Sequence, residues 1–152
     1  MKTKPMPVNS APVAVSTSCY CGPSPKRSSK RSEALTAAFH GEEFQIADQA
    51  FQLQEPTLRD HLHVLLSIDV EKTGLSPKHR ILPVRAADKD FPVTWIRAYG
   101  KGRVFYSSLG HGSPVFWNAP LLEHFLAGIQ YALGDLKADS TPSARLAAAA
   151  QK

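Results

Sequence analysis

The chain has few cysteines and no long apolar run. Its two cysteines, Cys19 and Cys21, stand two residues apart in CYCG. A structural zinc site normally takes four ligands, and a disulfide between residues so close would be strained, so we expect two reduced thiols and no metal there. No apolar stretch approaches the roughly 20 residues that a helix needs to span a bilayer. A disulfide scaffold and a helical membrane protein are therefore not expected.

The first residues also lack the features of a secretory signal. A signal peptide needs an uninterrupted apolar region, whereas Pro5, Pro7 and Pro12 interrupt the start of this chain. We therefore expect a cytoplasmic protein with no membrane partner, or one whose upstream signal has been lost by truncation.

The positive charge is unevenly distributed. The net charge is +5, and the run KRSSKR at residues 26–31 carries four positive charges within a Ser- and Pro-rich stretch. Such runs can bind nucleic acid, but no aromatic side chains alternate with the basic ones, as a single-strand binding surface requires. A solvated tail explains the run more simply, so nucleic acid is not an expected partner.

The composition divides the 152 residues into three parts. Residues 1–38 are rich in Pro, Ser, Lys and Arg and are predicted to form a disordered basic tail. Residues 39–137 show the alternation and helical spacing of one folded domain. Residues 138–152 are predicted to form a disordered or frayed helical tail.

Two segments in the first half of the domain predict strands. Residues 44–54 suit an extended segment with a break near Asp48. Residues 59–70 predict a strand, because their apolar residues run with few breaks from Leu62 to Ile68, a pattern typical of a strand covered on both faces. The polar residues 71–91 are punctuated by Gly and Pro and predict a loop.

The clearest local pattern is a hairpin followed by a helix. Residues 92–99 and 103–109 predict two strands joined at Gly100-Lys101-Gly102, because glycine supplies the positive φ of a tight turn. Asn118 is a good N-cap, and Gly134 stands where a glycine ends a helix. Between them, one apolar stripe at helical spacing is predicted to pack on a sheet. It consists of Leu121, Leu122, Phe125, Leu126, Ile129 and Leu133.

The order of these motifs resembles a known family. Residues 87–111 read ADKDFPVTWIRAYGKGRVFYSSLGH, and residues 116–136 read FWNAPLLEHFLAGIQYALGDL. Both resemble the C-terminal part of the ThuA-like (trehalose utilisation) domain. Upstream, FQIADQAFQLQ and HLHVLLSID match the same family in the right order. The resemblance covers roughly residues 39–136.

The resemblance implies an α/β fold and a link to sugar metabolism. The expected fold is a partial flavodoxin-like, class I glutamine amidotransferase-like three-layer fold, with strands, a β-hairpin and a C-terminal helix. Family members lack the glutaminase Cys-His-Glu triad, and no cysteine lies in the matching region here. A small-molecule sugar is the expected ligand, and the resemblance identifies no cofactor.

Two departures from the family pattern bear on function. Family members carry several βα units before the segment that resembles residues 44–54, where this chain has only the tail. The family's Asp-Glu pair followed by Tyr is here Asp48-Gln49 and Phe51. Two hypotheses follow: a domain that binds or turns over a sugar, or a truncated, inactive remnant that can only pair with another chain through an open sheet edge.

The candidate catalytic residue is His111. Ligands in open α/β sheets bind at the carboxyl ends of strands, and SSLGH follows the end of the second hairpin strand. Gly110 and Gly112 flank His111 and would let the backbone approach a ligand. His111 is therefore a candidate acid or base, metal ligand or partner of a sugar hydroxyl. The alternative is a structural histidine that bonds to the start of the helix.

The candidate substrate-binding residues are Asp48, Gln52, Gly110, Trp117 and Asn118. Asp48 and Gln52 face the same region as His111 in the family layout, and otherwise are exposed loop residues. Trp117 could stack on a sugar ring or pack against the hairpin. Asn118 is either a ligand contact or the helix cap.

One further histidine pair has a spacing that can suit a metal site. His61 and His63 would lie on one face of the predicted strand, where an H-x-H pair can bind a metal. No third ligand accompanies them, so an ordinary strand surface is the alternative and no metal site is predicted.

Overall fold

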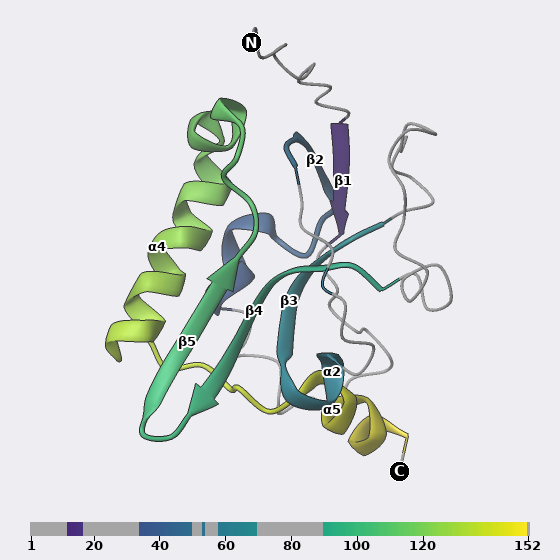
Figure 1. Ribbon diagram of the computed structural model, residues 1–152, viewed down its shortest axis with the longest axis vertical. Helices are drawn as coiled ribbons and strands as arrows, with labels where there is room; N and C mark the ends of the chain where they lie inside the picture. Colours follow the sequence, from purple (N-terminus) through teal and green to yellow (C-terminus); the bar gives the residue numbers. More distant parts are fainter. Residues whose placement is uncertain (1–11, 17–33, 50–52, 54–57, 70–89, 152) are drawn as a thin grey trace, which may run out of the picture.

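A computed structural model describes residues 12–16, 34–49, 53, 58–69 and 90–151 (Figure 1). The described strands form one sheet in the order β2-β1-β3-β4-β5, and every neighbouring pair is antiparallel. Their bounds are β1 (Pro12–Ser16), β2 (Phe44–Ala47), β3 (His63–Ile68), β4 (Pro92–Tyr99) and β5 (Gly102–Ser107).

Helices and 3₁₀ turns surround this sheet. Their bounds are η1 (Ala37–Phe39), α2 (Leu58–His61), η2 (Ser113–Trp117), α4 (Ala119–Leu133) and α5 (Ser143–Ala150). The described part is thus an α/β domain, consistent with the predicted partial flavodoxin-like fold. No helix within it is long and apolar enough to cross a membrane.

Strand β3 lies at the centre of the sheet. Val64, Leu65 and Leu66 are all buried, so the strand is covered on both faces as predicted. The predicted strand was too long at its start, however, because residues 58–61 form the helical turn α2. Leu58 and Leu62 are one helical turn apart, and both are buried beside Val64. Their burial favours a helical turn before the strand begins.

Two stretches of the predicted N-terminal tail have regular structure. Strand β1 pairs with both β2 and β3, and residues 34–36 are helical just before η1. The two valines of PVAVS suit a strand, and the stretch fills the place between β2 and β3. The basic run at 26–31 and the two cysteines lie outside the described residues, as does the loop predicted at 71–91 except for its last two residues.

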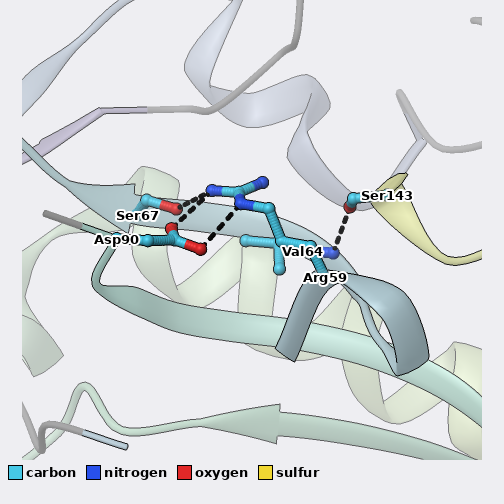
Figure 2. A network of polar contacts seen from close by, with 5 residues as sticks. All are labelled: Arg59, Val64, Ser67, Asp90 and Ser143. Carbon is cyan, nitrogen blue, oxygen red and sulfur yellow. Dashed lines mark hydrogen bonds and ion pairs between the residues drawn. The ribbon is translucent and has the colours of Figure 1, made fainter. Parts of the chain in front are cut away.

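The C-terminal segment docks on the start of β3. Ser143 begins α5, its N–H donates to the Leu62 carbonyl at 3.0 Å, and its Oγ accepts from Val64 N–H at 2.9 Å. Figure 2 shows this contact beside a second one, in which Arg59 donates to both carboxylate oxygens of Asp90 at 2.8 and 2.9 Å and to Ser67 Oγ at 3.1 Å. These bonds join α2, β3, the start of β4 and the C-terminal helix. Of the segment predicted as a disordered or frayed helical tail, residues 143–150 are helical and docked on the sheet.

The hairpin and both ends of α4 are close to the predicted positions, although the second strand covers residues 102–107 and not 103–109. Strands β4 and β5 pair in continuous register from Thr94 opposite Ser107 to Tyr99 opposite Gly102. Asn118 Oδ1 accepts a hydrogen bond from Leu121 N–H at 3.1 Å, and Gly134 ends α4. These features depend on neighbouring residues only, which is why the pattern of the sequence reveals them.

The buried face of α4 differs from the predicted stripe. The helix turns inward the side that carries Leu121, His124, Gly128 and Tyr131. Gly128 lies directly against the ring of Phe105 on β5, a contact that any side chain at this position would block. Four of the predicted core residues are instead exposed. They are Leu122, Leu126, Ile129 and Leu133.

Two buried histidines use their ring nitrogens inside the fold. His124 is fully buried, with Nδ1 2.6 Å from the Leu35 carbonyl and Nε2 3.2 Å from Thr94 Oγ1. His63 Nδ1 lies 2.8 Å from the Thr141 carbonyl. In both, the Nδ1–H donates to a carbonyl. Burial lowers the pKa of both imidazoles, although for His63 the Thr141 bond and the nearby Asp139 charge oppose the effect.

We predict that the protein loses stability as the pH falls below about 6.5, where unfolded histidines titrate. Below that value the histidines of the unfolded state bind protons, whereas the two buried imidazoles of the folded state stay neutral because their pKa values are lowered. The unfolding free energy therefore decreases as pH falls. The slope is at most about 1.4 kcal/mol per pH unit for each histidine. Urea unfolding between pH 5 and 8 measures it.

The control is His63→Gln, whose side-chain N–H can still donate to Thr141. This variant should have about half the slope, because one titrating group remains. A stability that is constant from pH 8 to pH 5 in the unmodified chain would contradict the burial of both rings in neutral form.

Candidate functional site

The candidate site is organised by Asp48, the residue that follows β2. The residue is only 4% exposed. Oδ2 accepts a hydrogen bond from Gly110 N–H, and Oδ1 accepts one from Gly112 N–H, both at 2.7 Å. Bonds to an ionised carboxylate are short and strong. One buried side chain therefore holds both residues that flank His111.

Both positions favour glycine, Gly110 because of its positive φ and Gly112 because a Cβ would have close neighbours. Gly110 has a φ of +123°, which side-chain-bearing residues rarely adopt. A Cβ on Gly112 would lie 3.3 Å from the Ala47 carbonyl oxygen and 3.4 Å from Asp48 Oδ1, closer than most real contacts. The G-H-G sequence thus allows the loop after β5 to press against the end of β2.

His111 projects from this fixed loop into solvent. The residue is exposed, and its imidazole makes no hydrogen bond to the described part of the chain. The alternative of a structural histidine bonded to the start of α4 therefore lacks the bond it needs. Among the described residues, nothing occupies either ring nitrogen, and an imidazole can both donate and accept hydrogen bonds.

Two aromatic rings follow His111 in η2. Val115 is fully buried and anchors this turn, whereas Trp117 is 86% exposed and Phe116 is 53% exposed. The Phe116 ring lies over Gly110, 3.6 Å from where a Cβ would be. The prediction that Trp117 packs against the hairpin is wrong, because Val115 takes the buried position of the turn. The indole instead stands at the surface, six residues after His111.

The remaining candidates have other roles or lie elsewhere. Of the two roles predicted for Asn118, the structure shows the helix cap, because its Oδ1 accepts a hydrogen bond from Leu121 N–H at the start of α4. Asp48 is not an exposed loop residue, and both of its oxygens are engaged by the glycines. Gln52 lies outside the described residues. The structure thus brings Asp48, Gly110 and His111 together, with Trp117 in the adjoining turn.

His61 and His63 do not lie on one strand face as the sequence suggested. His61 belongs to α2 and His63 to β3, so the two do not share a strand face, and His63 is buried with Nδ1 at the Thr141 carbonyl. No group of three or more His, Cys, Asp or Glu side chains that could hold a metal occurs in the described ranges.

The comparisons with known proteins identify the family of this chain. A family model described as trehalose utilisation (ThuA) matches residues 24–132, which is more than two thirds of the chain. The chain belongs to the ThuA family. The match includes Asp48, the G-H-G loop and nearly all of α4. It begins at residue 24, whereas the resemblance was expected to begin at residue 39. Neither the curated proteins nor the solved structures provided a match.

Sequence reasoning missed what Asp48 does in this ThuA domain. It treated Asp48 as a ligand contact or an exposed residue, whereas the carboxylate positions the loop. The sequence feature that points to this role is the spacing of Gly110 and Gly112. Two glycines two positions apart can bring both of their N–H groups to one carboxylate. The bidentate pair of Arg59 and Asp90 was missed as well, because 31 residues separate its partners.

We predict that Asp48→Asn destabilises the domain by about 1–3 kcal/mol. An amide keeps one acceptor oxygen but turns its NH₂ group toward the other glycine N–H, so one buried donor loses its partner. Urea unfolding measures the loss. The control is Asp135→Asn, which removes an exposed carboxylate just after α4 and should change the unfolding free energy by less than about 0.5 kcal/mol. Equal stability of the two variants would contradict the role given to Asp48.

Proposed function

We propose that the loop around His111 binds a sugar of the trehalose class and that this is how the ThuA domain takes part in sugar utilisation. The observation that carries the proposal is the exposure of Trp117 beside a loop held by a buried carboxylate. An indole that is 86% exposed gains little within the monomer. Its apolar face suits the C–H face of a pyranose ring, which stacks on aromatic side chains.

In this proposal His111 is the polar partner of the sugar. An imidazole both donates and accepts hydrogen bonds, and a sugar hydroxyl does the same. The loop that carries His111 is fixed at both neighbouring residues by Asp48, so little conformational freedom is lost when a ligand binds. His111 is also the candidate acid or base for any turnover of the sugar.

Asp48 and Gly110, named above as substrate-binding candidates, act here as positioning residues. Their carboxylate and N–H groups bond to each other and are not available to a ligand. The contacts to the sugar therefore come from His111 and Trp117. Glutamine hydrolysis through a thioester is not proposed, because the region matched by the family contains no cysteine.

We predict that trehalose, or a keto derivative of it, changes the fluorescence of Trp117. A sugar stacked on the indole removes water from it, so the emission shifts to shorter wavelength and acrylamide quenches it less. The chain has two tryptophans, and Trp95 is stacked on Tyr106 at 4.9 Å on the hairpin. Trp95→Phe should therefore keep the response, and Trp117→Phe should abolish it.

Calorimetric titration of the same sugars then tests His111. His111→Ala should weaken binding about tenfold, the effect of one lost hydrogen bond to a ligand, and should leave the unfolding free energy unchanged because the side chain is exposed. Absence of binding to trehalose and to its oxidised derivatives would overturn the proposal, as would binding that neither Trp117→Phe nor His111→Ala affects.

A further inference from the structure

The exposed apolar side chains of the described residues gather in one segment. Seven large hydrophobic residues are exposed, and six of them lie in η2 and α4. Four belong to the helix itself, and we call them the α4 seam. The seam consists of Leu122 at 43% exposure, Leu126 at 55%, Ile129 at 55% and Leu133 at 73%.

The seam runs along the side of α4 that faces away from the sheet. Its residues are spaced by four, three and four positions, which is the a/d spacing of helices that pack against one another. The opposite side carries the buried residues Leu121, His124, Gly128 and Tyr131. In Figure 1, α4 lies at one margin of the molecule, and no described element covers its outer side.

Charge is almost missing from α4. Glu123 is the one charged side chain among residues 119–133, because His124 is buried and burial lowers the pKa of its imidazole. A helix that stays at a protein surface normally carries charged or polar residues on its outer face. An outer face of leucine and isoleucine in this pattern marks an interaction site.

We propose that α4 pairs with α4 of a second copy of this chain in antiparallel orientation. The spacing of four, three and four reads the same in both directions, so a two-fold axis near residues 127–128 brings every seam residue against a seam residue. Leu122 meets Leu133 of the partner subunit, and Leu126 meets Ile129 of the partner subunit. A two-fold contact of one surface with itself is the commonest way in which identical chains associate.

The single charge of the helix favours the antiparallel orientation. In a parallel pair the two Glu123 side chains would lie side by side and repel each other. In the antiparallel pair they are about 14 Å apart along the helix axis, because nine residues of rise separate them. The guanidinium of Arg103 lies next to Gly134 at the C-terminal end of α4, the end that approaches the partner's Glu123. Opposite charges thus meet at both ends of the pair.

The size of the seam sets the strength of the dimer. A standard interface buries roughly 800 Å² on each partner, and four aliphatic side chains that are about half exposed supply less than that. We therefore expect a dimer that dissociates on dilution, with a dissociation constant on the order of 1–100 μM.

Sedimentation velocity of the full chain across this concentration range tests the proposal. Leu126→Glu places a charge at the centre of the seam in both copies and should raise the dissociation constant at least about 100-fold, about tenfold for each copy. The matched control is Gln130→Glu, which adds the same charge to an exposed position beside the seam and should leave the constant within about threefold. Leu126 is more than half exposed, so far-UV circular dichroism should not change, and neither should the unfolding free energy measured below about 1 μM, where both chains are monomeric.

Two results would overturn the proposal. One is a monomer at every concentration up to about 1 mM, well above the expected dissociation constant. The other is a dimer that Leu126→Glu leaves intact, which would assign association to the open edge at β5 instead.

Disulfide cross-linking tests the orientation without relying on a disruptive charge. In a background in which Cys19 and Cys21 are serine, Leu122→Cys and Leu133→Cys variants are prepared separately. The proposal predicts a cross-linked dimer in a mixture of the two variants and none in either variant alone. Efficient cross-linking of Leu122→Cys with itself would show a parallel pair and contradict the antiparallel arrangement.

Discussion

The candidate site depends on two hydrogen bonds from glycine N–H groups to the buried carboxylate of Asp48. Strands β2 and β5 are the two edges of the described sheet, so the loop that follows β5 must return across the sheet to reach β2. Asp48 holds it there at Gly110 and Gly112, 62 and 64 residues away in sequence. The same bonds fix the backbone on both sides of His111 and the start of the turn that presents Trp117. Without them, the site would consist of two exposed side chains on a free loop.

The segment that follows this loop, η2 and α4, contributes both to the core and to the exposed surface. Val115 and the inner side of α4 complete the core, with His124 joining the helix to Thr94 on β4 and to the Leu35 carbonyl before η1. Trp117 and the α4 seam remain outside. An ordinary surface helix has apolar residues inside and polar residues outside, whereas α4 has a histidine inside and leucines outside. Both departures can be explained. His124 is tolerated because both ring nitrogens are bonded, and the proposed partner helix would cover the leucines.

Local features of this chain could be predicted from its sequence, and non-local ones could not. The hairpin at Gly100-Lys101 and the caps Asn118 and Gly134 involve residues within a few positions of each other, and the structure has them as predicted. The rotation of α4 depends on the contact of Gly128 with Phe105 and on His124 bonds to residues 30 and 89 positions away. Counting apolar residues cannot decide which of two apolar sides turns inward. The role of Asp48 was missed for the same reason, since its partners lie on a distant loop.

Amide hydrogen exchange at Gly110 and Gly112 tests most directly whether Asp48 builds the site. If the carboxylate holds both N–H groups, the two amides should be protected to a degree similar to that of Ser108, whose N–H bonds to the Val93 carbonyl at 2.9 Å within the hairpin. Asp48→Asn should lower the protection of the two glycines more than that of Ser108. Exchange of both glycine amides at the rate of an unstructured peptide in the unmodified protein would contradict this account of the site.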